Sequence, residues 1–335
     1  MSEPPDRHRP RIWVLLGSRV GDNNQLLALA EALGLPFETR TMSYRRRWIR
    51  WLRLFPKHPF LLDRRSRRTL GPPWPDLVIG IGRRSVAVAR WIRRRNHGKT
   101  KLVRLGNPRA DPKLFDLVLT TPQYPVPEGE NVITLPLSMG RHRSIDASPD
   151  EAQWLAPLPR PHLLLSLGGV TRFWALANDT VADCGIRLAK RAADAGGTLI
   201  VVGSPRTAPA TVAEVKSALA GQPNVALDPP VRFPVLLADA DEHFVTADSV
   251  SMISEAVMTG KPVGLVPVEL DEEGRQELGR EQGFSSDFRD LRRFWAALEQ
   301  RGLAGTVGEP RAGAVEDPVE IAAAAVKRLS GDCVE

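Results

Sequence analysis

The sequence is poor in cysteine and lacks long apolar runs. Its two cysteines, Cys184 and Cys333, are far apart and belong to no Cys-X-X-Cys or Cys/His pattern, which argues against a disulfide framework or a zinc site. No segment approaches the roughly 18 consecutive apolar residues of a membrane span. Residues 1–11 are polar and Pro-rich and lack the apolar core of a signal peptide. These absences predict a cytoplasmic protein.

Acidic residues are scarce in one segment. Residues 44–104 contain nineteen Lys or Arg and only Asp63 and Asp76 as acids, a net charge of +17. Because the whole chain carries +7, the remainder sums to −10. Such an asymmetry concerns the partners of the protein rather than its fold.

Apolar strands alternate with helical patterns along the chain, whose 335 residues suggest two domains. Strands are predicted at 12–16, 76–81, 101–105, 115–120, 162–167, 198–202, 224–227, 242–246 and 262–267. Helices are predicted up to Leu33, up to Arg95, and near 175–195, 211–220, 235–239, 250–259 and 318–329. This alternation indicates parallel sheets built from βαβ units.

A stretch rich in Pro, Ser and charge, residues 141–160, is expected to link two domains. We place an N-terminal Rossmann-like domain at 1–145, a C-terminal one at 155–310, and a final helix and tail at 311–335. The predicted fold is α/β, with two Rossmann-like parallel-sheet domains that face each other across a cleft.

Small polar residues begin the predicted helix after the strand that ends at Thr246. The N–H groups at this helix start, near Asp248, Ser249 and Ser251, favour an anion such as a diphosphate. Glu255 follows at least a turn later, where its carboxylate can accept hydrogen bonds from a ribose diol. The alternative is that Asp248 or Ser249 caps the helix and Glu255 is a solvated surface residue.

The run from Thr246 to Val263 resembles the donor-binding element of GT-B glycosyltransferases. It is still more similar to the mitochondrial fission ELM family and its bacterial relatives. Their pattern, Thr-x-Asp-Ser-Val-Ser-Met-x-x-Glu-Ala-x-x-Thr-Gly-Lys-Pro-Val, is followed throughout the run. Gly21 with Gln25, and residues 75–84, resemble further family elements. The resemblance implies a GT-B-like fold with a nucleotide-sugar donor on the C-terminal domain.

Two loops of the second half complete the predicted donor site. Gly168 and Gly169 form a strand-to-helix turn in which backbone amides can approach a phosphate, although such turns need glycine anyway. The loop 203–209 resembles the family's Ser-Arg-Arg-Thr-Pro loop and retains Ser204, Arg206 and Thr207. Arg206 is predicted to pair with the donor diphosphate, the alternative being a surface arginine. The sequence departs from the family pattern at two places. Pro205 replaces an arginine, and residues 231–234 stand where Asn-Pro-Tyr is usual.

Asp22 is the candidate general base for an acceptor hydroxyl, because GT-B enzymes often take this base from the loop after the first strand. The rival interpretation is that Asp22, Asn23 or Asn24 is an N-cap. Asp239-Ala240-Asp241 has the Asp-x-Asp form of metal-dependent transferases, but the rest of that pattern is missing. No metal and no resident cofactor are therefore predicted, and the nucleotide sugar is a substrate.

The basic segment 44–68 has amphipathic spacing. Trp48, Trp51 and Phe55 share one helical face, and the surrounding arginines include Arg45, Arg46 and Arg47. Such a helix suits an anionic membrane surface on the inner face of the membrane. Packing of this face on the sheet is the alternative, and both are favoured over nucleic acid.

The leading functional hypothesis is a nucleotide-sugar-dependent glycosyltransferase of GT-B type that acts on a lipid or cell-envelope acceptor. The alternative is a non-catalytic GT-B-fold protein that mediates interactions or associates with a membrane, since a fold does not imply a function. The sequence does not indicate the sugar, the base, the acceptor or the oligomeric state.

Overall fold

The computed structural model describes residues 9–44, 62–140, 145–169, 171–283 and 285–331. Contacts divide the chain into two units. The first comprises Met1–Arg141, Gln282–Asp287 and Glu316–Glu335, and the second comprises His142–Glu281 and Phe288–Val315. The amphipathic segment predicted to meet a membrane, Arg45 to Phe55, lies outside the described residues.

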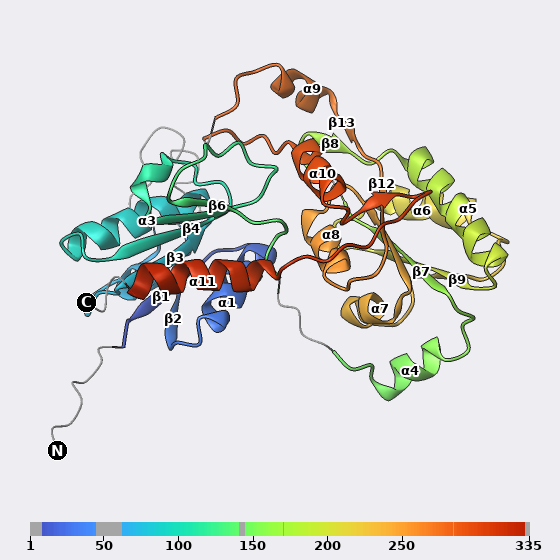
Figure 1. The fold of residues 1–335 in the computed structure, drawn as a ribbon, viewed down its shortest axis with the longest axis horizontal. Helices are drawn as coiled ribbons and strands as arrows, with labels where there is room; N and C mark the ends of the chain where they lie inside the picture. The colour runs from blue at the N-terminus through green and yellow to red at the C-terminus, as the bar shows by residue number, and fades with distance from the viewer. Residues whose placement is uncertain (1–8, 45–61, 141–144, 170, 284, 332–335) are drawn as a thin grey trace. The chain divides into compact units, whose positions relative to one another are not determined.

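The first unit contains a six-stranded parallel sheet in the order β2-β1-β3-β4-β5-β6 (Figure 1). Its strands are β1 (Ile12–Leu16), β2 (Phe37–Thr41), β3 (Leu77–Ile81), β4 (Lys101–Leu105), β5 (Leu117–Thr120) and β6 (Val132–Thr134). The helices are α1 (Val20–Ala32), α2 (Arg64–Arg68), α3 (Gly82–Arg95) and α11 (Pro318–Gly331), with a 3₁₀ turn at Pro112–Leu114.

Both faces of this sheet are covered, which explains why its central strands are mostly apolar, Lys101 and Arg104 of β4 being the charged positions. Side chains of a strand alternate between faces, so Ile12 and Val14 pack with α1 and α11, whereas Trp13 and Leu15 pack with α3. The last helix, α11, completes the core over α1, where Val326 is fully buried. In this division α11 is therefore part of the first unit.

The second unit repeats the plan with a parallel sheet in the order β10-β9-β7-β11-β12-β14. Its strands are β7 (His162–Leu167), β9 (Thr198–Gly203), β10 (Val225–Leu227), β11 (Glu242–Thr246), β12 (Val263–Val266) and β14 (Gly305–Thr306), and β8 (Trp174–Ala175) pairs with β13 (Glu269–Leu270) in a separate antiparallel ribbon. The helices are α4 (Pro149–Leu155), α5 (Asn178–Asp194), α6 (Pro209–Ala218), α7 (Phe233–Asp239), α8 (Val250–Val257), α9 (Glu272–Leu278) and α10 (Leu291–Gln300).

Part of the predicted linker is an ordered helix, contrary to the expectation for residues 141–160. Ser148 and Glu151 form a reciprocal capping box at the start of α4, with Pro149 in its first turn. Arg232 then fixes the helix to the second unit, because its side chain donates to both carboxylate oxygens of Glu151 at 2.8 and 2.6 Å. Arg232 lies at the position of a departure from the family pattern, which thus has a structural role.

The order of the strands places one topological switch point in each sheet. In the first unit the chain moves from β1 to β2 on one side and later to β3 on the other, so the switch lies between β1 and β3. In the second unit it lies between β7 and β11. Ligands of open α/β sheets bind at such points, outside the carboxyl ends of the strands.

Across the described segments, no helix is long and apolar enough to cross a membrane.

Candidate functional site

Three loops meet at the carboxyl edge of the second sheet, at its switch point. Because β7 lies between β9 and β11, the turn Gly168–Gly169 is flanked by residues 204–207 on one side and by Asp248 on the other. The structure thus brings together five of the residues that the sequence assigned to the donor, namely Gly168, Gly169, Ser204, Arg206 and Asp248. Ser249 is the N-cap residue of α8, and Ser251 and Glu255 lie within that helix.

Asp248 fastens the glycine turn to the start of α8. The Gly168 N–H donates to Thr246 Oγ1 at 2.7 Å, and the Gly169 N–H donates to Asp248 Oδ2 at 2.9 Å. Ser249, the N-cap residue of α8, makes no side-chain cap hydrogen bond, so the interpretation of Asp248 or Ser249 as a helix cap is wrong. Both glycine amides are engaged within the protein, so a phosphate at this edge has to be bound by other groups.

The loop after β9 holds the same turn from the opposite side. Ser204 Oγ donates to the Gly168 carbonyl at 3.0 Å, and Thr207 Oγ1 donates to the Leu167 carbonyl at 3.0 Å. The Arg206 backbone lies against Gly169, while the Arg206 side chain is exposed and forms no hydrogen bond or ion pair with a described residue. Its guanidinium is therefore available to an anion.

Only glycine fits at the two turn positions. A Cβ at Gly168 would lie 2.3 Å from Asp248 Oδ1, and a Cβ at Gly169 would lie 2.1 Å from the Arg206 carbonyl oxygen. Ordinary van der Waals contact begins at 3.4 Å. The requirement for glycine here comes from the close approach of three loops rather than from a left-handed backbone.

Two polar side chains of α8 have no partner among the described residues. Ser251 is exposed and Glu255 is half-buried, and neither side chain has a hydrogen bond or ion pair within the described part of the chain. Burial raises the pKa of the Glu255 carboxyl above its ordinary value. The uncapped positive end of the helix, together with Arg206, favours negative charge at this edge.

The first unit has a pocket of about 370 Å³ at its own switch point, lined by the loops after β1 and β3. Asp22 lines this pocket. The interpretation of Asp22, Asn23 or Asn24 as an N-cap is wrong, because α1 begins at Val20 with Arg19 as its N-cap residue. Asn23 instead closes the loop, bonding the Gly17 N–H at 2.9 Å and the Gly17 carbonyl at 3.0 Å. The role of Asp22 as a base stays a prediction.

Arginines dominate this pocket, which the sequence analysis did not predict. Those in its lining are Arg19, Arg83, Arg84 and Arg109. Arg104 is fully buried in the neighbouring strand β4, where it donates to the Gly82 carbonyl at 3.1 Å and to Ser85 Oγ at 2.6 Å. The signal in the sequence was an arginine inside the apolar run of residues 101–105, because a buried charge is rare without a specific reason.

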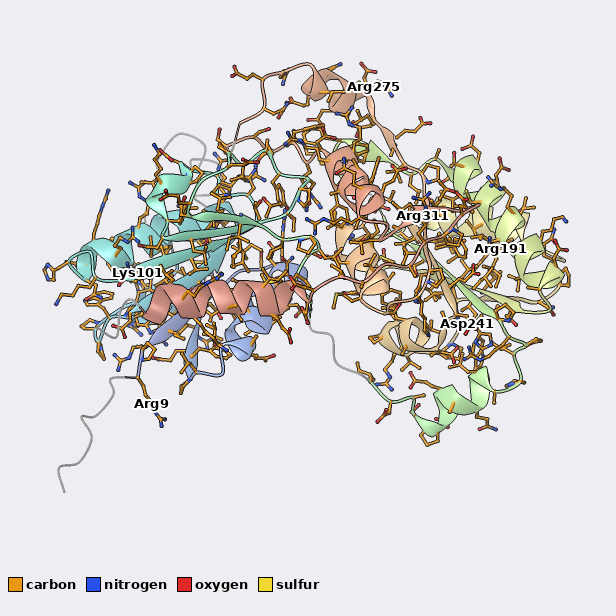
Figure 2. All side chains as sticks on the ribbon, in the orientation of Figure 1. Arg9, Lys101, Arg191, Asp241, Arg275 and Arg311 are labelled. Carbon is orange, nitrogen blue, oxygen red and sulfur yellow. The ribbon has the colours of Figure 1, made fainter. Side chains whose placement is uncertain are left out.

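The Asp-x-Asp sequence serves the structure of the second unit. Asp239 and Asp241 both pair with Arg160, and each also contacts His162. Asp239 Oδ2 lies 2.6 Å from His162 Nδ1, and Oδ2 of Asp241, which is labelled in Figure 2, accepts from the His162 N–H at 2.7 Å. Among the residues with described positions, no group of three His, Cys, Asp or Glu is arranged to hold a metal ion.

Comparisons with solved structures show the fold. UDP-GlcNAc 2-epimerase from Neisseria meningitidis bound to UDP-GlcNAc has a TM-score of 0.53 at 13% identity, over 96% of this chain and 100% of that chain. MurG from Acinetobacter baumannii has a TM-score of 0.51 at 15% identity, over 97% and 92% of the two chains. The chain thus has a GT-B-like fold with two Rossmann-like parallel-sheet units.

Sequence comparisons give the family. The chain is 31% identical over 239 residues to mitochondrial fission protein ELM1 of Arabidopsis thaliana, covering 60% of this chain and 53% of that protein. It spans about half the length of this curated relative. The model of the family "Mitochondrial fission ELM1" matches residues 20–324, which include the second sheet, the first sheet apart from β1, and the whole run from Thr246 to Val263. The chain therefore belongs to the mitochondrial fission ELM1 family.

Proposed function

We propose that the protein is a nucleotide-sugar-dependent glycosyltransferase whose donor binds at the switch point of the second sheet. The observation that carries this proposal is the arrangement at the start of α8. The N-terminal end of α8 has no side-chain cap, and the glycine turn beside it is itself bonded. The side chains of Arg206, next to this turn, and of Glu255, further along α8, have no hydrogen bond or ion pair with a described residue. Polar groups that lack partners within the protein are suited to partners on a ligand.

Each group has a distinct role in this proposal. Arg206 forms a charge-assisted pair with the donor diphosphate, and the N–H groups at the start of α8 stabilise the same negative charge. Glu255 accepts hydrogen bonds from the ribose diol. Asp248 and Ser204 do not need to touch the donor, because their contacts hold Gly168 and Gly169 and so set the shape of the edge.

The bound state of one structural neighbour supports the choice of nucleotide. The Neisseria epimerase is described with UDP-GlcNAc, so we propose a UDP-sugar as the donor. In the transfer, an acceptor hydroxyl oxygen forms a bond to the anomeric carbon as the bond from that carbon to the diphosphate oxygen breaks. The nucleoside diphosphate leaves, and the hydroxyl proton passes to a base, for which Asp22 remains our candidate. We propose a lipid or cell-envelope acceptor, with the basic segment 44–68 at the membrane surface.

Donor binding is tested by a thermal-shift titration of the purified chain with UDP, UDP-GlcNAc and the corresponding adenosine and guanosine compounds. A ligand at a hundredfold excess over its Kd adds about 2.7 kcal/mol of stability, which corresponds to about 5–10 °C for a unit of this size. Glu255→Gln is expected to weaken the uridine ligands at least about tenfold, because a hydrogen bond to a charged group is lost.

Glu214→Gln is the matched control, since Glu214 is an exposed residue of α6 in the same unit. Equal affinities in the two variants would refute the assignment of Glu255. Release of UDP from a UDP-sugar distinguishes transfer from the alternative of a non-catalytic GT-B-fold protein, which binds without turnover. If no nucleotide of the set raises the melting temperature, the donor site itself is refuted.

A further inference from the structure

The arginine pocket of the first unit lies where a parallel sheet of this topology binds its ligand. Its lining comes from the ends of β1, β3 and β4, with Gly17, Gly82 and Gly106 among the lining residues. The switch point lies between β1 and β3. A volume of about 370 Å³ falls within the range of small-molecule sites and exceeds the space that a few waters need.

The charge in and under the pocket is strongly unbalanced. Five arginines face two acids, Asp22 and Asp287, and Asp287 is already paired with Arg109. Burial lowers the pKa of the Arg109 guanidinium, Asp287 and Tyr124 oppose this by attraction, and Arg83 and Arg19 lower it by repulsion. Arg19 and Arg83 are exposed and form no hydrogen bond or ion pair with a described residue. Like charges gathered in this way favour an anion between them.

Arg104 adds a buried cation beneath the pocket. Its terminal nitrogens donate to neutral oxygens, those of Gly82, Ser85 and Asn107, and its Nε atom is buried with no hydrogen-bond partner. Burial lowers the pKa of Arg104 to about 9, so the group still carries its charge at neutral pH. Asp22 opposes this lowering by attraction, but no ion pair to Arg104 occurs among the described residues. A fully buried charge is costly without such a pair, and a ligand anion supplies further compensation.

The two helices that begin at the pocket add to this preference. α1 starts next to Arg19 and α3 starts at Gly82, and neither helix has a side-chain cap on its N-terminal N–H groups. Gly82 has a φ of +74°, which lets the chain turn directly from β3 into α3. The positive ends of both helix dipoles therefore lie beside the arginines.

We propose that this pocket is a second anion site, which binds the phosphate or diphosphate group of a phosphorylated compound. Only the naming of that compound as the sugar acceptor rests on the proposed function. Arg83 and Arg19 hold the phosphate oxygens by charge-assisted forks, while Arg104 and the two helix ends contribute charge without needing to move.

The site is tested on the full chain by calorimetric titration with inorganic pyrophosphate, at low and at physiological ionic strength. Pyrophosphate is expected to bind, and more weakly as salt is added. Arg83→Gln and Arg19→Gln are each expected to weaken it at least about tenfold, since each removes a hydrogen-bonded charge. Arg94→Gln is the control, because Arg94 is an exposed arginine in the last turn of the same helix and is not in the pocket lining.

Arg206→Gln distinguishes the two anion sites of the protein. Loss of pyrophosphate binding in Arg206→Gln but not in Arg83→Gln would overturn the proposal and place the anion on the donor loops. Equal binding in Arg83→Gln and Arg94→Gln, or no binding at all, would also overturn it. Pyrophosphate binding that depends on Arg83 supports the site even if UDP does not bind and the proposed function fails.

Vesicles identify the source of the phosphate. Sedimentation with phosphatidic acid vesicles, compared with phosphatidylcholine vesicles, shows whether the group belongs to a lipid. If the protein binds these vesicles, if pyrophosphate displaces them, and if Arg83→Gln abolishes the binding, the phosphate group belongs to a lipid headgroup. Pyrophosphate binding without vesicle binding assigns it to a soluble phosphorylated compound, and either result supports an anion site in this pocket.

Discussion

Alanine at the glycine turn of the second unit should disrupt the meeting of the three loops. In Gly169→Ala the new Cβ would lie 2.1 Å from the Arg206 carbonyl oxygen, so the backbone has to open by about 1.3 Å to reach the ordinary 3.4 Å. Overpacking of this kind costs about 1–3 kcal/mol. For a unit of this size, the melting temperature should fall by about 2–12 °C.

Gly168→Ala should be destabilising for a different reason. Its Cβ meets the Asp248 carboxylate at 2.3 Å, and the carboxylate can move only by giving up the Gly169 N–H. A buried donor left unpaired costs about 1–3 kcal/mol. Gly203→Ala is the matched control, because a Cβ at the end of β9 would meet only the Thr207 side chain, at 3.5 Å or more. Thermal and urea denaturation of the three variants measure the differences.

A double-mutant cycle with Asp248→Ala tests the mechanism. Once the carboxylate is gone, Gly168→Ala has no obstacle, so the double variant should be more stable than the sum of the two single losses predicts, by about 1 kcal/mol or more. Gly169→Ala should gain much less from Asp248→Ala, since its obstacle is the Arg206 backbone. If Gly168→Ala is as stable as Gly203→Ala, or if the first cycle is additive, the reasoning from close approach is refuted.

Two further predictions concern acid. Burial lowers the pKa of His243 from 6.5 to about 4. Between these pH values the unfolded chain binds a proton that the folded chain does not, so the free energy of unfolding should fall by about 3 kcal/mol as the pH is lowered through this range. Urea titrations at pH 7 and 4.5 should show that His243→Gln loses less unfolding free energy between these pH values than the unchanged protein does. An equal loss in the two proteins would contradict this. The Arg232 hydrogen bonds lower the pKa of Glu151, whose stabilisation is therefore present at neutral pH and lost as the pH falls below 4.5. Arg232→Met should increase amide hydrogen exchange in residues 149–155 at pH 7, and unchanged protection would show that α4 is held by other contacts.

The central strands were predictable from sequence because both faces of each sheet are covered. β1, β4, β7 and β11 were predicted at their observed bounds, since all their positions except Lys101 and Glu242 are apolar or buried. The edge strand β2, Phe37–Thr41, was missed because four of its five residues are polar, its side chains are partly or fully exposed, and it contains no apolar run. Helix α4 was missed because Pro and charge at 148–155 also fit a linker, and its stability depends on Arg232, some 80 residues away.

The candidate sites were predictable to a different extent in the two units. Apart from Ser251 and Glu255 in α8, the donor residues lie in loops that directly follow predicted strands, so the meeting of these loops at one edge follows from strand order. Local sequence does not show that the Gly168 and Gly169 amides are already bonded, because their acceptors lie nearly 80 residues further along the chain. The arginine pocket was missed because its members come from separate elements, with Arg104 inside an apolar strand.

The position of α11 has a consequence for synthesis. The core of the first unit needs this helix over α1, yet Pro318 is made after the whole of the second sheet. At roughly 5–20 residues per second, the chain between β6 and α11 takes about 10–40 s to synthesise. During that interval the apolar face around Leu29 has no cover from α11, and the later sheet has the chance to fold first. Folding on the ribosome would then run against the order of the sequence, and the nascent first unit would be the part that most needs a chaperone.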